Sequence, residues 1–241
     1  ALTGPVDGVA GLESRYALTD PLALTAGYWQ GDSQQQAILD DYAVKRTDLG
    51  LAYALTDGLS LSVGAGLVQE DNGLLGARGS GALGLGEENR LSLGRVGLDY
   101  SFGEHWSGFA GYERGHADDV SGNGLIAGIE DIRSEETAFG LQWRDERHQA
   151  ALTIRQPLRL ESATATLDVP VGRTLDGQVV RETREVSLAP SGQQRDIELG
   201  YVLRQDPSTQ WRFNLLYTQQ PGHDSEAGNE ISTLLNYSRA F

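Results

Sequence analysis

The chain has 241 residues, a formal net charge of -15, a sequence pI near 4.6 and a mean hydropathy of -0.36. The negative electrostatic potential of such a protein repels polyanions, so we expect no nucleic-acid partner. No run reaches the roughly 18 apolar residues of a membrane-spanning helix, and the absence of cysteine excludes disulfides, thiolate metal sites and cysteine nucleophiles. A transmembrane barrel is not excluded, because alternating strands hide their apolar band from averaged hydropathy.

The length fits one large β domain, and we treat residues 1–241 as a single unit. The sequence contains no methionine, which favours a mature or processed product of a longer precursor. We therefore expect a C-terminal fragment of that precursor.

Apolar residues recur at every second position, and turn residues are abundant, with 31 glycines. In chain order, this pattern predicts strands at 8–19, 22–31, 42–56, 58–69, 75–86, 90–102, 105–116, 133–145, 147–160, 162–170, 179–189, 194–205, 210–220 and 230–241. Alternatively, the segments 162–170 and 179–189 together form one excursion outside the main sheet. We expect about 12 strands, with about 14 as the alternative.

The clearest unit is a hairpin over residues 49–67. Aliphatic and aromatic residues such as Leu51, Tyr53 and Leu61 alternate with glycine, alanine and serine on both sides of Asp57-Gly58. An Asp-Gly pair supplies the positive φ angles of a tight hairpin turn. The unit predicts two antiparallel strands with one apolar face.

Later strands carry charges and amides opposite their apolar residues. On an outer-membrane barrel these polar side chains point inward. The candidate lumen-lining residues are Glu136, Gln142, Arg144, Glu198, Arg204, Arg212 and Asn214.

The last eleven residues alternate most clearly, and the sequence ends on an aromatic residue. Leu235, Tyr237 and Phe241 share one face, which is the pattern of a final barrel strand whose rings lie at the membrane boundary. Leu234 and Arg239 depart from the alternation. We take Phe241, Tyr237 and Leu235 as a candidate assembly signal, and we expect this strand to pair with the first one, near residues 8–19.

The connections also alternate in length. Short turns near 18–21, 103–104 and 206–208 contrast with longer polar loops near 31–41, 117–132, 171–178 and 220–229. This asymmetry is typical of outer-membrane barrels, so the predicted fold class is all-β, a single closed antiparallel barrel. Because soluble sandwiches also alternate, the alternative is a water-soluble extracellular β-rich module that decorates the cell surface or self-associates into a homo-oligomer.

The remaining motifs predict no catalytic, cofactor or metal site. The glycines of 81–86 spell a loose dinucleotide motif without a following helix, and Ser80 lacks the glycine needed two positions before a hydrolase nucleophile. The pair His223 and Asp224 has no recognisable nucleophile beside it. The acidic pairs at 118–119, 130–131 and 135–136 lack calcium-loop spacing. We expect no enzyme activity and no cofactor.

Several segments occur in an order that resembles a known family. They are residues 73–82, 138–141, 156–167, 169–177, 188–192, 196–201 and 220–223. Together they resemble the C-terminal, autotransporter-like region of proteobacterial subtilisin-family serine proteases, from about residue 60 onward. No position matches that family's catalytic Asp, His and Ser motifs, so its protease activity does not carry over.

The resemblance implies a Gram-negative outer-membrane barrel that anchors or exports an N-terminal subtilisin-like passenger. The implied partners are the lipid bilayer and lipopolysaccharide, the barrel-assembly machinery and the chain's own passenger. The family helix that would thread the lumen is not evident before residue 8.

Overall fold

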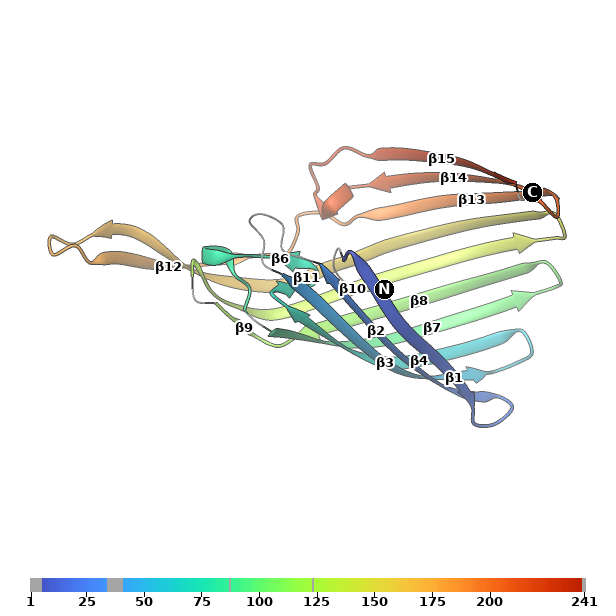
Figure 1. Cartoon of the computed structure of the whole chain (residues 1–241), viewed down its shortest axis with the longest axis horizontal. Helices are drawn as coiled ribbons and strands as arrows, with labels where there is room; N and C mark the ends of the chain where they lie inside the picture. The colour runs from blue at the N-terminus through green and yellow to red at the C-terminus, as the bar shows by residue number, and fades with distance from the viewer. Residues whose placement is uncertain (1–5, 34–40, 87, 123, 240–241) are drawn as a thin grey trace.

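The computed structural model describes residues 6–33, 41–86, 88–122 and 124–239. Its main sheet is an antiparallel meander in which each strand pairs with the next long strand along the chain (Figure 1). The strands on this path are β1 (Gly8–Ala17), β2 (Leu22–Ser33), β3 (Tyr42–Ala54), β4 (Leu59–Asp71), β7 (Glu88–Phe102), β8 (Trp106–Ala117), β10 (Ile126–Arg144), β11 (His148–Arg173), β13 (Arg195–Asp206), β14 (Thr209–Gln219) and β15 (Glu230–Arg239).

Two further strands leave this path. The short strand β9 (Val120–Ser121) pairs with β10, and β12 (Val179–Ser187) pairs with the outer part of β11. The sheet thus has 13 strands, and the all-β antiparallel class is confirmed. The β11–β12 hairpin projects beyond the rest of the sheet, as Figure 1 shows, which matches the alternative that residues 162–170 and 179–189 form one excursion. Among the described residues the path begins at β1 and ends at β15, so pairing between the terminal strands stays a prediction.

Two predicted strands were wrong. Residues 75–86 do not form a sheet strand: the region holds a small hairpin of β5 (Gly73–Leu74) and β6 (Ala77–Arg78), then a 3-10 turn, η1 (Gly81–Leu83). Positive φ angles at Asn72, Leu75 and Gly76 turn the chain away from an extended path. Residues 162–170 are not a separate strand either, because β11 continues through them past register shifts in its pairing with β10.

The sheet has two chemically different faces. In β3, Tyr42, Val44, Arg46 and Asp48 are buried, whereas the residues between them are mostly exposed. Because paired residues in adjacent strands point to the same side, the strand registers carry this division from β1 to β15. We call the face with Arg46 and Asp48 the inner face and the opposite face the outer face.

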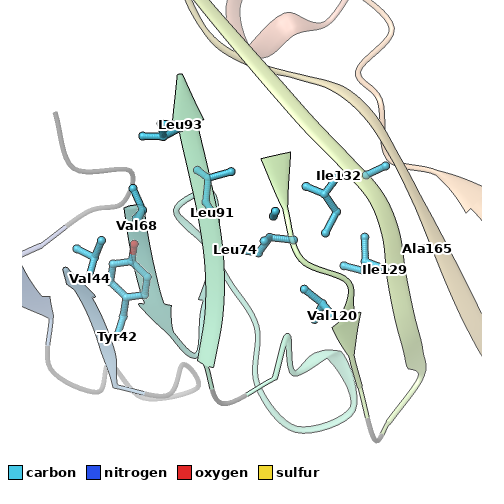
Figure 2. Packing of buried hydrophobic residues seen from close by; sticks show 12 residues of the cluster. Tyr42, Val44, Val68, Leu74, Leu91, Leu93, Val120, Ile129, Ile132 and Ala165 are labelled. Carbon is cyan, nitrogen blue, oxygen red and sulfur yellow. The ribbon is translucent and has the colours of Figure 1, made fainter. Parts of the chain in front are cut away.

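The buried core lies on the inner face near the rim with the longer connections, which we call the long-loop rim. Figure 2 shows its side chains converging from several strands. The cluster contains Tyr42, Val44, Val68, Leu74, Leu91, Leu93, Ala117, Val120, Ile129, Ile132, Ala163 and Ala165. Leu74 comes from the small hairpin and lies between strands of the sheet, so residues 73–85 form an inner cover over this end. We call the opposite rim, with the short turns, the short-turn rim.

Candidate functional site on the inner face

A charge network lies on the inner face, next to the apolar core. Arg46 Nε is 2.8 Å from Asp48 Oδ2, and Arg46 Nη2 is 2.8 Å from Glu113 Oε2. Arg95 Nη1 reaches the other oxygen, Asp48 Oδ1, at 3.1 Å. Alternation puts Arg46 and Asp48 on one face of β3, and register pairs Arg95 with Glu113 across β7 and β8.

Because Arg46 and Asp48 are buried, each of these charges needs its ion-pair partners to remain stable inside the protein. The side chain of Arg46 is 7% exposed and that of Asp48 is 2% exposed. A charge removed from water is tolerated only when it is paired and hydrogen-bonded. Two glycines of β4 leave space for the charged side chains. A Cβ atom at Gly66 would lie 2.7 Å from Asp48 Oδ1, and one at Gly64 would lie 2.8 Å from Arg95 Nε. The small residues of β4 therefore let the network form.

A second set of contacts holds the inner cover in place. Tyr42 Oη donates to Glu70 Oε1 at 2.8 Å, and the same oxygen accepts the Gly76 backbone N–H at 3.0 Å. Asn89 Nδ2 donates to the Gly73 and Leu85 carbonyls at 2.6 and 2.7 Å. Buried polar groups of β3, β4 and β7 thus fix residues 73–85 against the core.

The predicted lumen-lining residues all lie on the inner face. Glu136, Gln142 and Arg144 belong to β10, where Glu136 pairs in register with Glu113 of the charge network. The other four belong to β13 and β14, and Glu198 Oε1 accepts a hydrogen bond from Asn214 Nδ2. The structure therefore brings Glu136 beside the charge network. Gln142 and Arg144 lie farther along β10 toward the short-turn rim, and the remaining four residues lie along a separate part of the same face.

Two hollows on the inner face follow this division. One, of about 730 Å³, is lined by residues that include Glu13, Arg15, Trp29, Arg46, Asp48 and Arg95. The indole ring of Trp29 lies where side chains at Gly11 and Gly27 would otherwise stand. The other hollow, of about 450 Å³, is lined by Arg212, Asn214 and Asn236 among others.

The charge network was not predicted from the sequence. Arg46, Asp48, Arg95, Glu113 and Trp29 were not among the candidate lumen residues. One signal was present: Arg46 and Asp48 are two positions apart and precede Gly50 and Ala52 on the polar side of the same strand. The pairing with Glu113 depends on a contact across 67 positions of sequence, which the pattern of single strands does not reveal.

The outer face carries exposed apolar and aromatic residues from β1 to β15. Leu61, Leu141 and Leu199 are 37%, 40% and 42% exposed. Continuous apolar surface of this kind marks contact with a membrane or another protein. At the last strand, Leu235 and Tyr237 lie on this face, with the Tyr237 ring centroid 4.6 Å from that of Trp211. Phe241, the third residue of the candidate assembly signal, lies outside the described residues.

His223 has a structural role. Its Nδ1 accepts the Gln194 backbone N–H at 2.9 Å, and its Nε2 donates to the Leu158 carbonyl at 3.0 Å. Burial lowers the pKa of His223, and nearby Arg159 adds to this effect. Asp224 instead accepts from Ser191 Oγ at 3.4 Å. Since backbone groups occupy both ring nitrogens, the imidazole fixes the turn η2 (Pro221–His223) and makes no pair with Asp224.

Within the described ranges, no group of three or more His, Asp or Glu side chains is placed to hold a metal ion. Two of the acidic residues considered above have other contacts: Asp131 pairs with Arg133 at 2.7 Å, and Glu135 accepts from Gln156 Nε2 at 2.9 Å. In the described part of the chain, no helix is long and apolar enough to cross a membrane.

No family model and no curated protein matches this chain. Solved structures do resemble it. A mutant of the monoaromatic hydrocarbon channel TodX matches with a TM-score of 0.57 and 15% identity, over 100% of this chain and 78% of the channel. The Pseudomonas putida toluene transporter TodX matches with a TM-score of 0.52 and 14% identity, over 92% of this chain and 71% of the transporter.

A mutant ferric enterobactin receptor, PfeA of Pseudomonas aeruginosa, matches with a TM-score of 0.50 and 14% identity. The match covers 96% of this chain but only 38% of the receptor. At these identities the likeness concerns the fold. The chain has the fold of outer-membrane β-barrels, which agrees with the predicted location in the outer membrane of a Gram-negative bacterium.

Proposed function

We propose that this domain is the outer-membrane translocator or anchor of a longer precursor and carries an N-terminal subtilisin-like passenger. The observation that supports it most is the sorting of side chains across the whole sheet. Outside the buried core at the long-loop rim, register keeps mostly charged, polar and small residues on the inner face and apolar residues on the outer face from β1 to β15. A barrel in lipid needs this division, with hydrogen-bonded strands and a polar interior.

The inner face suits passage or attachment of a polypeptide. Its charges are of both signs: Arg46, Asp48, Arg95 and Glu113 form one network, and Arg212 and Asn214 line the second hollow. A lumen with mixed charges and amides hydrates an extended chain without favouring one charge sign. In this proposal Glu136, Gln142, Arg144, Glu198, Arg204, Arg212 and Asn214 line that lumen. The passenger itself is implied by the family resemblance described above.

A channel for small molecules is the second candidate. It is favoured by the hollow of about 730 Å³, where the ring of Trp29 lies among paired charges. The TodX structures with a similar fold are channels for monoaromatic hydrocarbons. In this second proposal the hollow would admit an aromatic solute, and no passenger would be needed.

One export experiment distinguishes the translocator from the channel. A reporter placed upstream of residue 1 should become accessible to protease added outside intact cells. Leu235→Asp puts a charge on the outer face and should abolish both membrane insertion and reporter exposure, whereas Asn236→Asp on the inner face should leave both intact. Insertion without reporter exposure would contradict the translocator and favour the channel. A protein that stays in solution without detergent would contradict both and favour a soluble module.

A further inference from the structure

The projecting β11–β12 hairpin leaves one edge of β12 open. The nine residues of β12 are all exposed, and they pair on one side with residues 164–173 of β11. Among the described residues, no strand pairs with the other side of β12. Figure 1 shows this hairpin standing clear of the remaining sheet. An open edge presents a row of backbone N–H and C=O groups with which another strand can pair.

The hydrogen bonds of the hairpin decide which residues of β12 present those groups. Leu188 N–H donates to the Ala163 carbonyl, and Thr174 N–H donates to the Gln178 carbonyl. Hydrogen-bonded positions alternate along an antiparallel pair, so the even-numbered residues of this strand turn their backbone groups toward β11. The odd-numbered residues turn theirs toward the open edge, and they are Val179, Arg181, Thr183, Glu185 and Ser187.

The charges of β12 are complementary to the same strand read in reverse. The strand reads Val-Val-Arg-Glu-Thr-Arg-Glu-Val-Ser, with Thr183 at its centre. When two copies pair antiparallel about Thr183, Arg181 lies opposite Glu185 of the second copy. In the same register, Glu182 lies opposite Arg184 of the second copy. Opposite charges directly across a strand pair are stabilising, and each of these pairs occurs twice by symmetry.

The neighbouring registers oppose like charges. In a symmetric antiparallel pair, the central residue lies opposite its own copy. A centre at Arg181, Glu182, Arg184 or Glu185 therefore sets two identical charges against each other, which is destabilising. Thr183 is the uncharged residue between them, so the charge pattern selects the register centred on it.

The composition of β12 also fits a second copy of this chain. The strand contains two arginines and two glutamates and is therefore neutral, whereas the whole chain has a formal net charge of -15. In the register centred on Thr183, Val180 lies opposite Val186 of the second copy. Each of these valines is 43% exposed in the single chain, so pairing also removes apolar surface from water.

We propose that β12 pairs antiparallel with β12 of a second copy of this chain, about a two-fold axis at Thr183. β11 continues from the main sheet into the hairpin without a break, and Figure 1 shows the hairpin extending along the length of the sheet. Antiparallel pairing reverses the second hairpin, so the two barrels lie at opposite ends of the contact. Because the longer loops of outer-membrane barrels are extracellular, the contact joins two facing cells.

Charge reversal in two cell populations tests this pairing. Cells that display the chain, and whose lipopolysaccharide lacks its long polysaccharide so that the hairpins can meet, should aggregate. Arg181→Glu opposes glutamates at both symmetric positions, and Glu185→Arg opposes arginines there. Each variant alone should lower the affinity about tenfold or more and abolish aggregation. When the two variant populations are mixed, opposite charges face each other again, and mixed aggregates should form.

The double variant R181E/E185R is the matched control, because it restores complementarity within one chain and should aggregate with itself. The heat-dependent gel shift of each variant checks that the barrel is folded. Absence of aggregation by the unsubstituted chain, or equal aggregation by all variants, would overturn the proposal. Neither readout depends on export of a passenger, so this inference and the proposed function can fail separately.

Cysteine cross-linking tests the register, because the 241 residues contain no cysteine. Thr183→Cys lies opposite its own copy with about 5.5 Å between the Cα atoms, within the reach of a disulfide, and should form a covalent dimer. Val171→Cys, exposed on β11 of the same hairpin, should stay monomeric. Dimers at position 171 but not at 183 would overturn the register. With a different tag in each population, dimers that never join two tags would overturn the contact between facing cells.

Discussion

Two neighbouring regions of the inner face differ in how they remove side chains from water. At the long-loop rim, Tyr42 and Val44 of β3 enter an apolar core that residues 73–85 cover. Two residues further along the same face, Arg46 and Asp48 enter a network of ion pairs. One strand thus changes from apolar packing to charge pairing without changing its geometry. The alternation of a strand decides which face a residue occupies, and side-chain chemistry then decides whether that part of the interior is covered or polar.

The largest effect should come from breaking the charge network. Asp48→Leu removes the carboxylate that pairs with both Arg46 and Arg95, so the nearly buried Arg46 loses one of its two carboxylate partners in the network. Loss of one partner in a buried ion pair costs about 3–5 kcal/mol. We expect a decrease of this size in the free energy of unfolding, measured by urea titration in lipid vesicles.

Asp99→Leu is the matched control, because this aspartate lies on the same face of β7 and is exposed. It should change the unfolding free energy by less than about 1 kcal/mol. Equal losses for the two variants would show that the network does not stabilise the barrel.

The apolar end should respond to cavity formation. Ile132 has no exposed surface, and Ile132→Ala should lower the free energy of unfolding by about 2–5 kcal/mol. Ile154→Ala, on the outer face, should cost less because lipid chains can fill the space that it leaves. The same urea titration measures both variants, and a larger loss at Ile154 would contradict the assignment of the faces.

The inner cover should loosen when Asn89 is replaced. Asn89→Ala leaves the Gly73 and Leu85 carbonyls without its side-chain donor, at a cost of about 1–3 kcal/mol. We expect faster reaction of Leu93→Cys, in the buried core, with a water-soluble thiol reagent. Gln30→Ala removes an exposed hydrogen bond from Tyr28 Oη, away from the cover, and is the control. Similar thiol reaction rates in both backgrounds would show that the Asn89 contacts do not hold the cover closed.

The smallest effect concerns pH. Burial depresses the pKa of His223 from its usual 6.5, so the folded protein favours the neutral ring that binds Gln194 N–H and Leu158 O. Its contribution to stability is fully present above pH 6.5 and is lost as pH falls from there through the lower pKa of the folded state. His223→Gln should flatten this part of the pH profile of unfolding. An unchanged profile would assign the pH dependence to other groups.

The sequence predicted the strands well because alternation is a local property. The starts expected at residues 8, 22, 42 and 230 are those of β1, β2, β3 and β15. Residues 75–86 were misassigned because residues such as Leu75 and Leu85 resemble the apolar residues of a strand, although tertiary packing holds the segment against the core. The polar face of 133–145 was identified, but Arg46 also pairs with Glu113 of β8, 67 positions away, and such distant pairing cannot be derived from alternation within one strand.

The central claim is that the inner face contacts water while the outer face contacts lipid. Nitroxide labels at Leu199→Cys and Gly200→Cys test it most directly, because these neighbours point to opposite faces of β13. In vesicles, a lipid-soluble relaxation agent should act on the label at position 199 and a water-soluble one on the label at position 200. Labels at Leu215→Cys and Gly140→Cys should repeat this contrast. Water contact at positions 199 and 215, with lipid contact at 140 and 200, would contradict the account.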